Sequence, residues 1–270
     1  MSLRPGGHHS SGGTPPDPRR PGTPAWRILR TSAWIEGKLF LREPMTVAFA
    51  LALPLLFLFV LGGVFGNTPD ADIYGGHGPL DFYVPAYLGL VWAAVGLLAL
   101  PVHLARYRED GVLRRLHASA APRWTVLGAQ GIVSLAIALV GAVLLIAAAA
   151  LVYDIHAPRS PWGVAAAWLL AGMVFISLGI LLGCVPTSRG ALGAGLGLFF
   201  VMMMLGGAGP PFEVMTSVMR HVSDLLPLTY VNRVLQAPWL GTALAWGDVA
   251  VAAGIALASG IAAWAAFRRE

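Results

Sequence analysis

The sequence predicts an all-α polytopic membrane protein with six transmembrane helices. Its 270 residues are 57% hydrophobic and only 11% charged, with a mean hydropathy of +0.70. About a quarter of the residues in a soluble domain are charged, so this excess of apolar side chains requires lipid as its solvent. The apolar residues also gather in long uncharged runs, and about 20 such residues are enough to cross a bilayer as a helix.

Six such runs are predicted to span the membrane. The third is longer than the bilayer is thick, so we expect it to tilt or to protrude. The fifth is short and ends in the sequence GGAGPP. The predicted spans are residues 45–65, 84–104, 126–152, 162–185, 191–207 and 249–267.

The distribution of Arg and Lys predicts that both termini are cytoplasmic. Fifteen of the 18 basic residues lie on the side of the N-terminal segment, of the loop 106–123 and of the C-terminus, and only Arg159, Arg220 and Arg233 lie on the other side. Positive charge is retained in the cytoplasm. An even number of spans also returns the chain to its starting side, so we expect a multi-pass protein of the bacterial inner membrane.

The predicted transmembrane domain occupies residues 25–270. Two segments precede its first span: a tail outside the domain and a helix inside it. Residues 1–24 are rich in Gly, Pro, Ser and Arg and lack an apolar core, so we expect a disordered cytoplasmic tail. Residues 26–42 have the periodicity of an amphipathic helix that lies on the membrane surface. The site residues assigned to this interfacial helix are Arg27, Arg30, Lys38, Arg42 and Glu43.

The connection between the fifth and sixth spans, residues 208–247, is too polar to cross the membrane but rich in Val, Leu and Met. Prolines stand where helices begin or end. We expect two short extracellular helices, 212–226 and 229–240, that re-enter the outer leaflet or lie along it, with an ordinary surface loop as the alternative. The site residues assigned to this segment are Gly206, Gly207, Pro210, Pro211, Glu213 and Pro227.

The sequence lacks the motifs of an energy source. A Walker A loop needs G-x-x-x-x-G-K-[ST], whereas the only Lys, Lys38, is followed by Leu39. No charged residue lies inside the six predicted spans, which disfavours coupling to protons or sodium. With one cysteine, Cys184, and no paired His motif, we expect no disulfide, no metal and no cofactor in this chain.

Four groups of residues carry a family resemblance. LREP at 41–44 precedes a first span that contains Pro54 and ends in GGVFG at 62–66. RYREDGVLRRL at 106–116 is followed by APR at 121–123. Residues 206–213 lead to LPLTY at 226–230, and the last span closes on FRR at 267–269. In this order, the set resembles the permease subunits of type-2 ATP-binding cassette exporters, especially actinobacterial drug-efflux permeases.

The resemblance implies that the loop 106–123, hereafter the charged loop, holds a short coupling helix that seats in a groove of a separate ATPase. The residues alone agree with a helix, since Arg106 and Asp110 form an opposite-charge pair at i,i+4, although a solvated charge run is the alternative. Val112 and Arg114 depart from the commoner family pattern, R-E-x-G-T-L-E-R-L. The residues assigned to coupling are Arg106, Tyr107, Arg108, Glu109, Asp110, Gly111, Leu113, Arg114, Arg115 and Leu116.

We therefore expect the permease subunit of an ATP-driven exporter. ATP and Mg²⁺ would bind a P-loop ATPase partner, and a second permease copy and membrane lipid are the other expected partners, without nucleic acid. An uncharged membrane interior favours a lipophilic or amphipathic cargo. The alternatives are export of a glycan or lipid-linked glycan, a membrane scaffold that transports nothing, and a proton-driven transporter.

Overall fold

The computed structural model describes residues 51–111, 124–184 and 187–268, together with Arg27, Arg30, Thr31, Ala33, Trp34, Gly37 and Lys38. Every regular element in this part of the chain is helical. Five helices are long and apolar enough to cross a membrane, and a shorter apolar helix, α3 (Leu53–Phe65), accompanies them.

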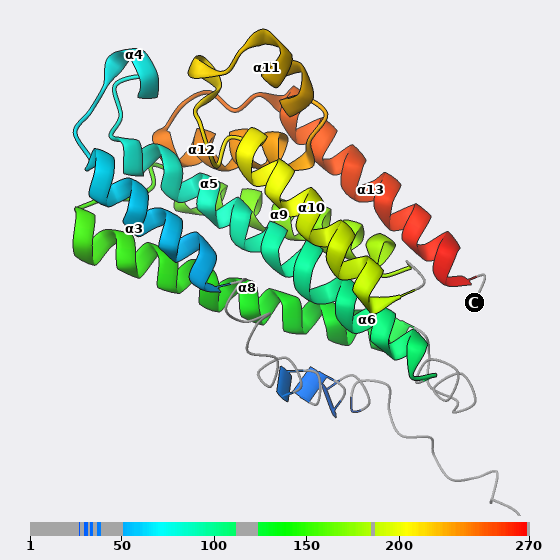
Figure 1. Ribbon diagram of the computed structural model, residues 1–270. Coiled ribbons are helices and arrows are strands. Elements are labelled where there is room, and N and C mark those ends of the chain that lie inside the picture. Colours follow the sequence, from blue (N-terminus) through cyan, green and yellow to red (C-terminus); the bar gives the residue numbers. More distant parts are fainter. Residues whose placement is uncertain are drawn as a thin grey trace, which may run out of the picture.

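The long helices run side by side in one bundle (Figure 1). α5 (Pro79–Ala94) continues through a π-helical turn, η2 (Val95–Ala99), into α6 (Leu100–Glu109), and we call these three elements the central helix. The other long helices are α8 (Trp124–Tyr153), α9 (Pro161–Leu182), α10 (Ser188–Leu205) and α13 (Trp246–Arg268). The short elements are α4 (Ala71–Tyr74), the 3₁₀ turn η3 (Phe212–Val214), α11 (Ser217–Ser223) and α12 (Pro227–Leu240).

Local sequence explains where several helices begin and end. α9 begins at Pro161, and the hydroxyl of Ser160 accepts a hydrogen bond from the N–H of Gly163 at 3.2 Å. In the same way, Thr187 caps α10 by accepting from the N–H of Gly190 at 3.1 Å. Ser and Thr at this position satisfy donors that have no partner within the helix. α12 ends at Leu240 and is capped by Gly241, whose φ of 78° is readily adopted by glycine alone.

The central helix forms the core of the bundle. Every residue from 79 to 105 is buried, and α3, α8, α9, α10 and α12 pack around it. Close contact with α9 and α10 depends on glycine. A Cβ at Gly179 of α9 would collide with the carbonyl oxygen of Gly96, and one at Gly195 of α10 would collide with that of Leu97. Both carbonyls belong to η2, so the π-helical turn is where three helices approach most closely.

The peripheral helices expose apolar side chains along their outer faces. Leu139 and Val143 of α8 are 53% and 58% exposed, and Leu257 and Ile261 of α13 are each 66% exposed. Such continuous apolar surface is rare on a soluble monomer. Such faces suit contact with lipid or with another membrane helix, which supports the prediction of an integral membrane protein.

The structure confirms helices at the last five predicted spans. Residues 84–104 lie within the central helix, and residues 126–152, 162–185, 191–207 and 249–267 correspond to α8, α9, α10 and α13. The central helix extends beyond the predicted span at both ends, from Pro79 to Glu109, and includes Asp81 in its first turn. The first span is described only from residue 51, so the total of six remains a prediction.

The connection 208–247 also differs from the prediction in its first half. The expected helix 212–226 is broken into η3 and α11, because Thr216 is extended and its hydroxyl accepts from the N–H of Met219, which starts a new helix. The second expected helix is confirmed as α12, two residues longer at its start because Pro227 takes its first position. Re-entry into the outer leaflet remains a prediction.

Of the predicted interfacial helix, the seven described residues are all helical. The continuity of that helix remains a prediction. The tail 1–24 and the assigned residues Arg42, Glu43, Leu113, Arg114, Arg115 and Leu116 lie outside the described residues.

Candidate coupling site at the end of α6

The charged residues at the end of α6 lie where two other helices end. Arg106, Arg108 and Glu109 occupy the last turn of α6, and Asp110 caps it. The C-terminal end of α9 and the N-terminal end of α10 lie at the same end of the bundle, opposite α11 (Figure 1). We call this the α6 end and the opposite one the α11 end.

Glu109 binds the start of α10. The backbone N–H of Ser188 donates to its Oε1 at 2.8 Å. This N–H belongs to the first turn of a helix, where donors lack intrahelical partners and the helix dipole favours negative charge. The N–H and hydroxyl of Ser188, with Arg106 and Arg189 nearby, hold the pKa of the Glu109 carboxyl below its usual range. Glu109 lies beyond the apolar run 84–104, so it belongs to the charged loop and not to the predicted span.

Arg108 binds the end of α9. Its Nη1 donates to the carbonyl oxygen of Gly183, the C-cap of α9, at 3.2 Å. The C-terminal end of a helix carries partial negative charge, which suits a guanidinium. Two adjacent residues of opposite charge thus bind two helix ends of opposite polarity, and they connect α6 to both neighbours.

The predicted coupling segment, Tyr107 to Leu116, is divided at Gly111. α6 ends at Glu109, and Gly111 has a φ of 65°, which favours glycine. Tyr107, Arg108 and Glu109 therefore continue the long central helix instead of starting a separate short one. The coupling role of these residues remains a prediction.

The charged end of α6 is continuous with the buried core. In the middle of the central helix, η2 packs against Gly179 of α9 and Gly195 of α10. These two helices therefore contact the central helix both at its end and at its middle. Further along, the ring of Trp92 lies 4.9 Å from that of Trp168 of α9, with Gly172 in contact. A displacement of the α6 end would therefore move α9 and α10 as well.

At the α11 end, Asp81 forms a polar cluster that the sequence did not reveal. Its side chain is only 6% exposed. The backbone N–H of His156 donates to its Oδ1 at 2.8 Å, the Nδ1 of His156 lies 2.8 Å from its Oδ2, and Asn67 donates at 3.3 Å. These bonds join the loop after α3, the start of α5 and the loop after α8. Pro79 at the first helical position and an acid in the first turn were the available signals of a helix start.

A model of the family described as "ABC-2 type transporter" matches residues 27–238. The chain belongs to the ABC-2 type transporter family. The match begins in the interfacial segment, includes the charged loop and ends within α12, so it covers three of the four groups of residues that carried the resemblance and leaves out FRR at 267–269.

A relative of this ABC-2 permease points the same way. "Putative transport permease YvfS" of Bacillus subtilis (strain 168) is 25% identical over 202 residues, which are 74% of this chain and 80% of that protein. The family and this relative identify the chain as a membrane transport permease, a subunit that is generally not catalytic itself. Membership of the family also implies an ATPase partner.

The structure brings some predicted residues of the 206–227 segment into contact with the core of the permease. The carbonyl oxygen of Gly206 accepts from the Nδ2 of the buried Asn232 at 2.7 Å. Gly207 has a φ of 83°, and the ring of Phe212 lies against it. The guanidinium of Arg233 stacks over Phe212 at 5.0 Å and binds Asp224 at 3.0 Å. Pro210 and Pro211 precede η3, and Pro227 begins α12.

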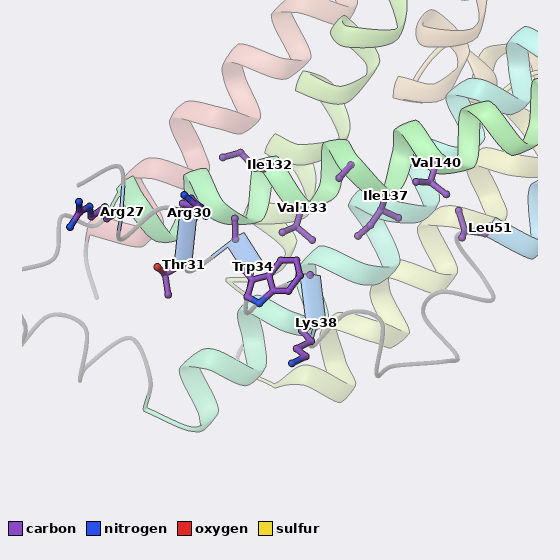
Figure 2. A pocket seen from close by; sticks show the side chains of 13 residues that line it. Arg27, Arg30, Thr31, Trp34, Lys38, Leu51, Ile132, Val133, Ile137 and Val140 are labelled. Atoms are coloured by element: carbon purple, nitrogen blue, oxygen red, sulfur yellow. The ribbon is translucent and has the colours of Figure 1, made fainter. Parts of the chain in front are cut away.

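The basic residues of the interfacial segment line a groove along α8. Arg27, Arg30 and Lys38 share this groove with Ile137 and Val140 of α8 (Figure 2). The structure thus gathers the described residues of the predicted basic face at one site, far along the chain from the helix that they face.

Proposed function

We propose that this permease exports a lipophilic or amphipathic compound, drug-like or lipid-like, with energy from ATP hydrolysis on a separate subunit. In this proposal, ATP and Mg²⁺ bind the ATPase partner, and the chain supplies the path through the membrane. The charged loop receives the movement of the ATPase.

The observation that carries the proposal is the pair of contacts at the α6 end. Glu109 binds the start of α10 and Arg108 binds the end of α9. A force applied to the charged loop would reach three helices at once, and the buried central helix would carry it toward the α11 end. Concerted displacement of packed helices is the change that alternating access requires.

The proposed cargo class rests on the apolar character of the bundle. A groove of about 540 Å³ lies between α8, α9 and α13, and Trp92, Met173, Ser177 and Trp264 are among its lining residues. Its described lining contains no charged side chain. Such a surface suits a ligand whose binding depends on apolar contact.

We further propose that two permease copies pair with two ATPase subunits in the bacterial inner membrane. Both termini and the charged loop would then be cytoplasmic, and the 208–247 segment would re-enter the outer leaflet. Fifteen of the 18 basic residues lie in segments that this orientation places in the cytoplasm, which supports it.

Co-purification tests the coupling role. The double variant Arg114→Glu, Arg115→Glu should lose the ATPase encoded beside this chain while the permease itself remains in the membrane, because reversed charge opposes docking. Arg268→Glu, a reversal at the end of α13, is the matched control and should retain the ATPase. Equal retention by both variants would contradict the coupling assignment.

Transport by inverted membrane vesicles tests the export function. Vesicles with permease and ATPase should accumulate a fluorescent lipophilic dye only when ATP is added. A scaffold subunit would retain the ATPase without accumulating dye. Uptake driven by a proton gradient without ATP would instead support the proton-coupled alternative.

A further inference from the structure

The groove between the interfacial segment and α8 has the properties of a lipid site. It has a volume of about 1280 Å³, and it is walled by α8 on one side and by the described residues of the interfacial segment on the other (Figure 2). None of the contacts described at the α6 end involves this groove, so the proposed coupling of the permease to an ATPase does not account for it.

One wall of the groove is apolar and open to the surroundings. Ile132 and Val140 of α8 are 45% and 51% exposed, and Val133 and Ile137 lie between them. Val140 lies about 24 Å along α8 from Trp124, so this wall reaches the middle of a helix that is long enough to cross a membrane. The hydrocarbon chain of a lipid satisfies such a surface.

The opposite wall carries basic side chains beside apolar ones such as Trp34. Arg27, Arg30 and Lys38 line the groove, and its described lining contains no Asp or Glu. Figure 2 shows Arg27 and Arg30 at one end of the groove and Leu51 and Val140 at the other. The charged end corresponds to the start of α8 and the apolar end to its middle.

We propose that this groove binds one anionic phospholipid, whose phosphate contacts Arg30 and whose acyl chain lies along Ile137 and Val140. The polarity of the groove, charged at the membrane surface and apolar in the interior, matches that of the lipid. Basic side chains near a membrane surface favour anionic headgroups, and each contributes about 1 kcal/mol. A lipid in this position joins the interfacial segment to α8, which lies far from it in the sequence.

Native mass spectrometry of the purified full chain, without any ATPase, tests this site. The delipidated protein is titrated with dioleoyl phosphatidylglycerol or with dioleoyl phosphatidylcholine, which differ in the headgroup alone. We expect one phosphatidylglycerol to be retained per chain, and Arg30→Gln to weaken that retention about fivefold. Arg268→Gln removes a charge at the end of α13 and should leave retention unchanged. Phosphatidylcholine should be retained weakly by all three proteins.

A second pair of variants tests the position of the acyl chain. Ala136 is exposed and lines the groove, so Ala136→Trp fills the groove without entering the packed face of α8. Leu139→Trp places the same side chain on the lipid-facing side of α8, outside the groove, and is the matched control. Retention of phosphatidylglycerol should fall in Ala136→Trp alone.

Three results would overturn the proposal. Equal retention of the two lipids would identify ordinary surrounding lipid, and equal behaviour of Ala136→Trp and Leu139→Trp would place the lipid elsewhere. Loss of a dimer instead of a lipid in Ala136→Trp would assign the groove to a second copy. Because the ATPase is absent, failure here is distinguishable from failure of the proposed coupling.

Discussion

At the scale of single residues, the charged loop differs from a solvated charge run because two of its side chains are bound. Glu109 accepts from Ser188 and Arg108 donates to Gly183. Ion pairs on a protein surface contribute little to stability. A charged side chain that binds a helix end also provides a hydrogen-bond partner for a backbone group that otherwise lacks one. These two residues therefore fix the end of α6 before any ATPase binds.

Glu109→Gln should weaken the contact between α6 and α10 in a pH-dependent way. The native pKa of Glu109 is lowered from an ordinary value of 4.5. Its contribution to stability is thus fully present above pH 4.5 and is lost as the pH falls through the lowered native pKa. Thermal unfolding in detergent should show a small decrease for the variant at neutral pH and no difference in strong acid.

Asp110→Asn is the control for this prediction, since it removes a neighbouring charge and leaves the Ser188 bond in place. A pH-independent effect of Glu109→Gln, or an equal effect of both variants, would show that the carboxylate does not hold α10.

At the scale of the helices, the packing of η2 depends on the absence of two side chains. Gly179 and Gly195 allow the backbones of α9 and α10 to approach the carbonyl oxygens of Gly96 and Leu97. The π-helical turn thus lies at a fixed contact between three helices, where no side chain could adjust to a shift. π-helical turns often occur at functional sites.

Gly195→Ala and Gly197→Ala should have opposite effects, although the two positions lie on the same helix. The methyl group at residue 195 would overlap the carbonyl oxygen of Leu97, whereas nothing lies within 4 Å of a Cβ at residue 197. We expect Gly195→Ala to cost about 1–3 kcal/mol of unfolding free energy and Gly197→Ala to add about 0.5–1 kcal/mol.

Denaturant titration of the two purified variants measures this difference. Since both sites share the helix and the membrane environment, equal changes would show that α10 does not pack tightly against η2.

The helices that the sequence predicted well are those whose limits depend on neighbouring residues. α8, α9, α10 and α13 coincide with uncharged apolar runs and are bounded by local signals such as the Ser160 cap. The apolar run 84–104 does not include the start of α5, where Asp81 lies in the first turn. Its carboxylate accepts a hydrogen bond from the backbone N–H of His156, which lies 75 residues away in the sequence. Likewise, Glu109 and Ser188 are separated by 79 residues, and no spacing in the sequence connects them. The break at Thr216 was predictable, because Thr is a common helix cap.

At the scale of the whole molecule, the described helices form a bundle with a buried centre and an apolar periphery. The contacts of Arg108 and Glu109 lie at the α6 end and the Asp81 cluster at the α11 end, and the central helix joins them. The basic residues predict which end faces the cytoplasm, and the number of spans determines whether the two termini share a side.

Cysteine labelling should place both ends of the chain on the same side of the membrane. In a Cys184→Ser background, Thr31→Cys and Arg268→Cys should react with a membrane-impermeant maleimide only in inverted vesicles. Ala157→Cys, in the exposed loop between α8 and α9, should react only in intact cells. Labelling of residues 31 and 268 from opposite sides would require an odd number of spans and would contradict the six-span topology.

The complete burial of α5 has a consequence for how the protein is made. This helix enters the membrane early, but α9, α10 and α12, which cover it, follow much later in the chain. His156, whose backbone N–H binds Asp81, is synthesised 75 residues later than Asp81, which takes about 4–15 s of translation. During that interval the apolar sides of the helix lack the helices that cover them in the finished protein, and the carboxylate of Asp81 lacks the backbone N–H of His156. The most completely buried part of the finished permease is therefore synthesised before the helices that bury it.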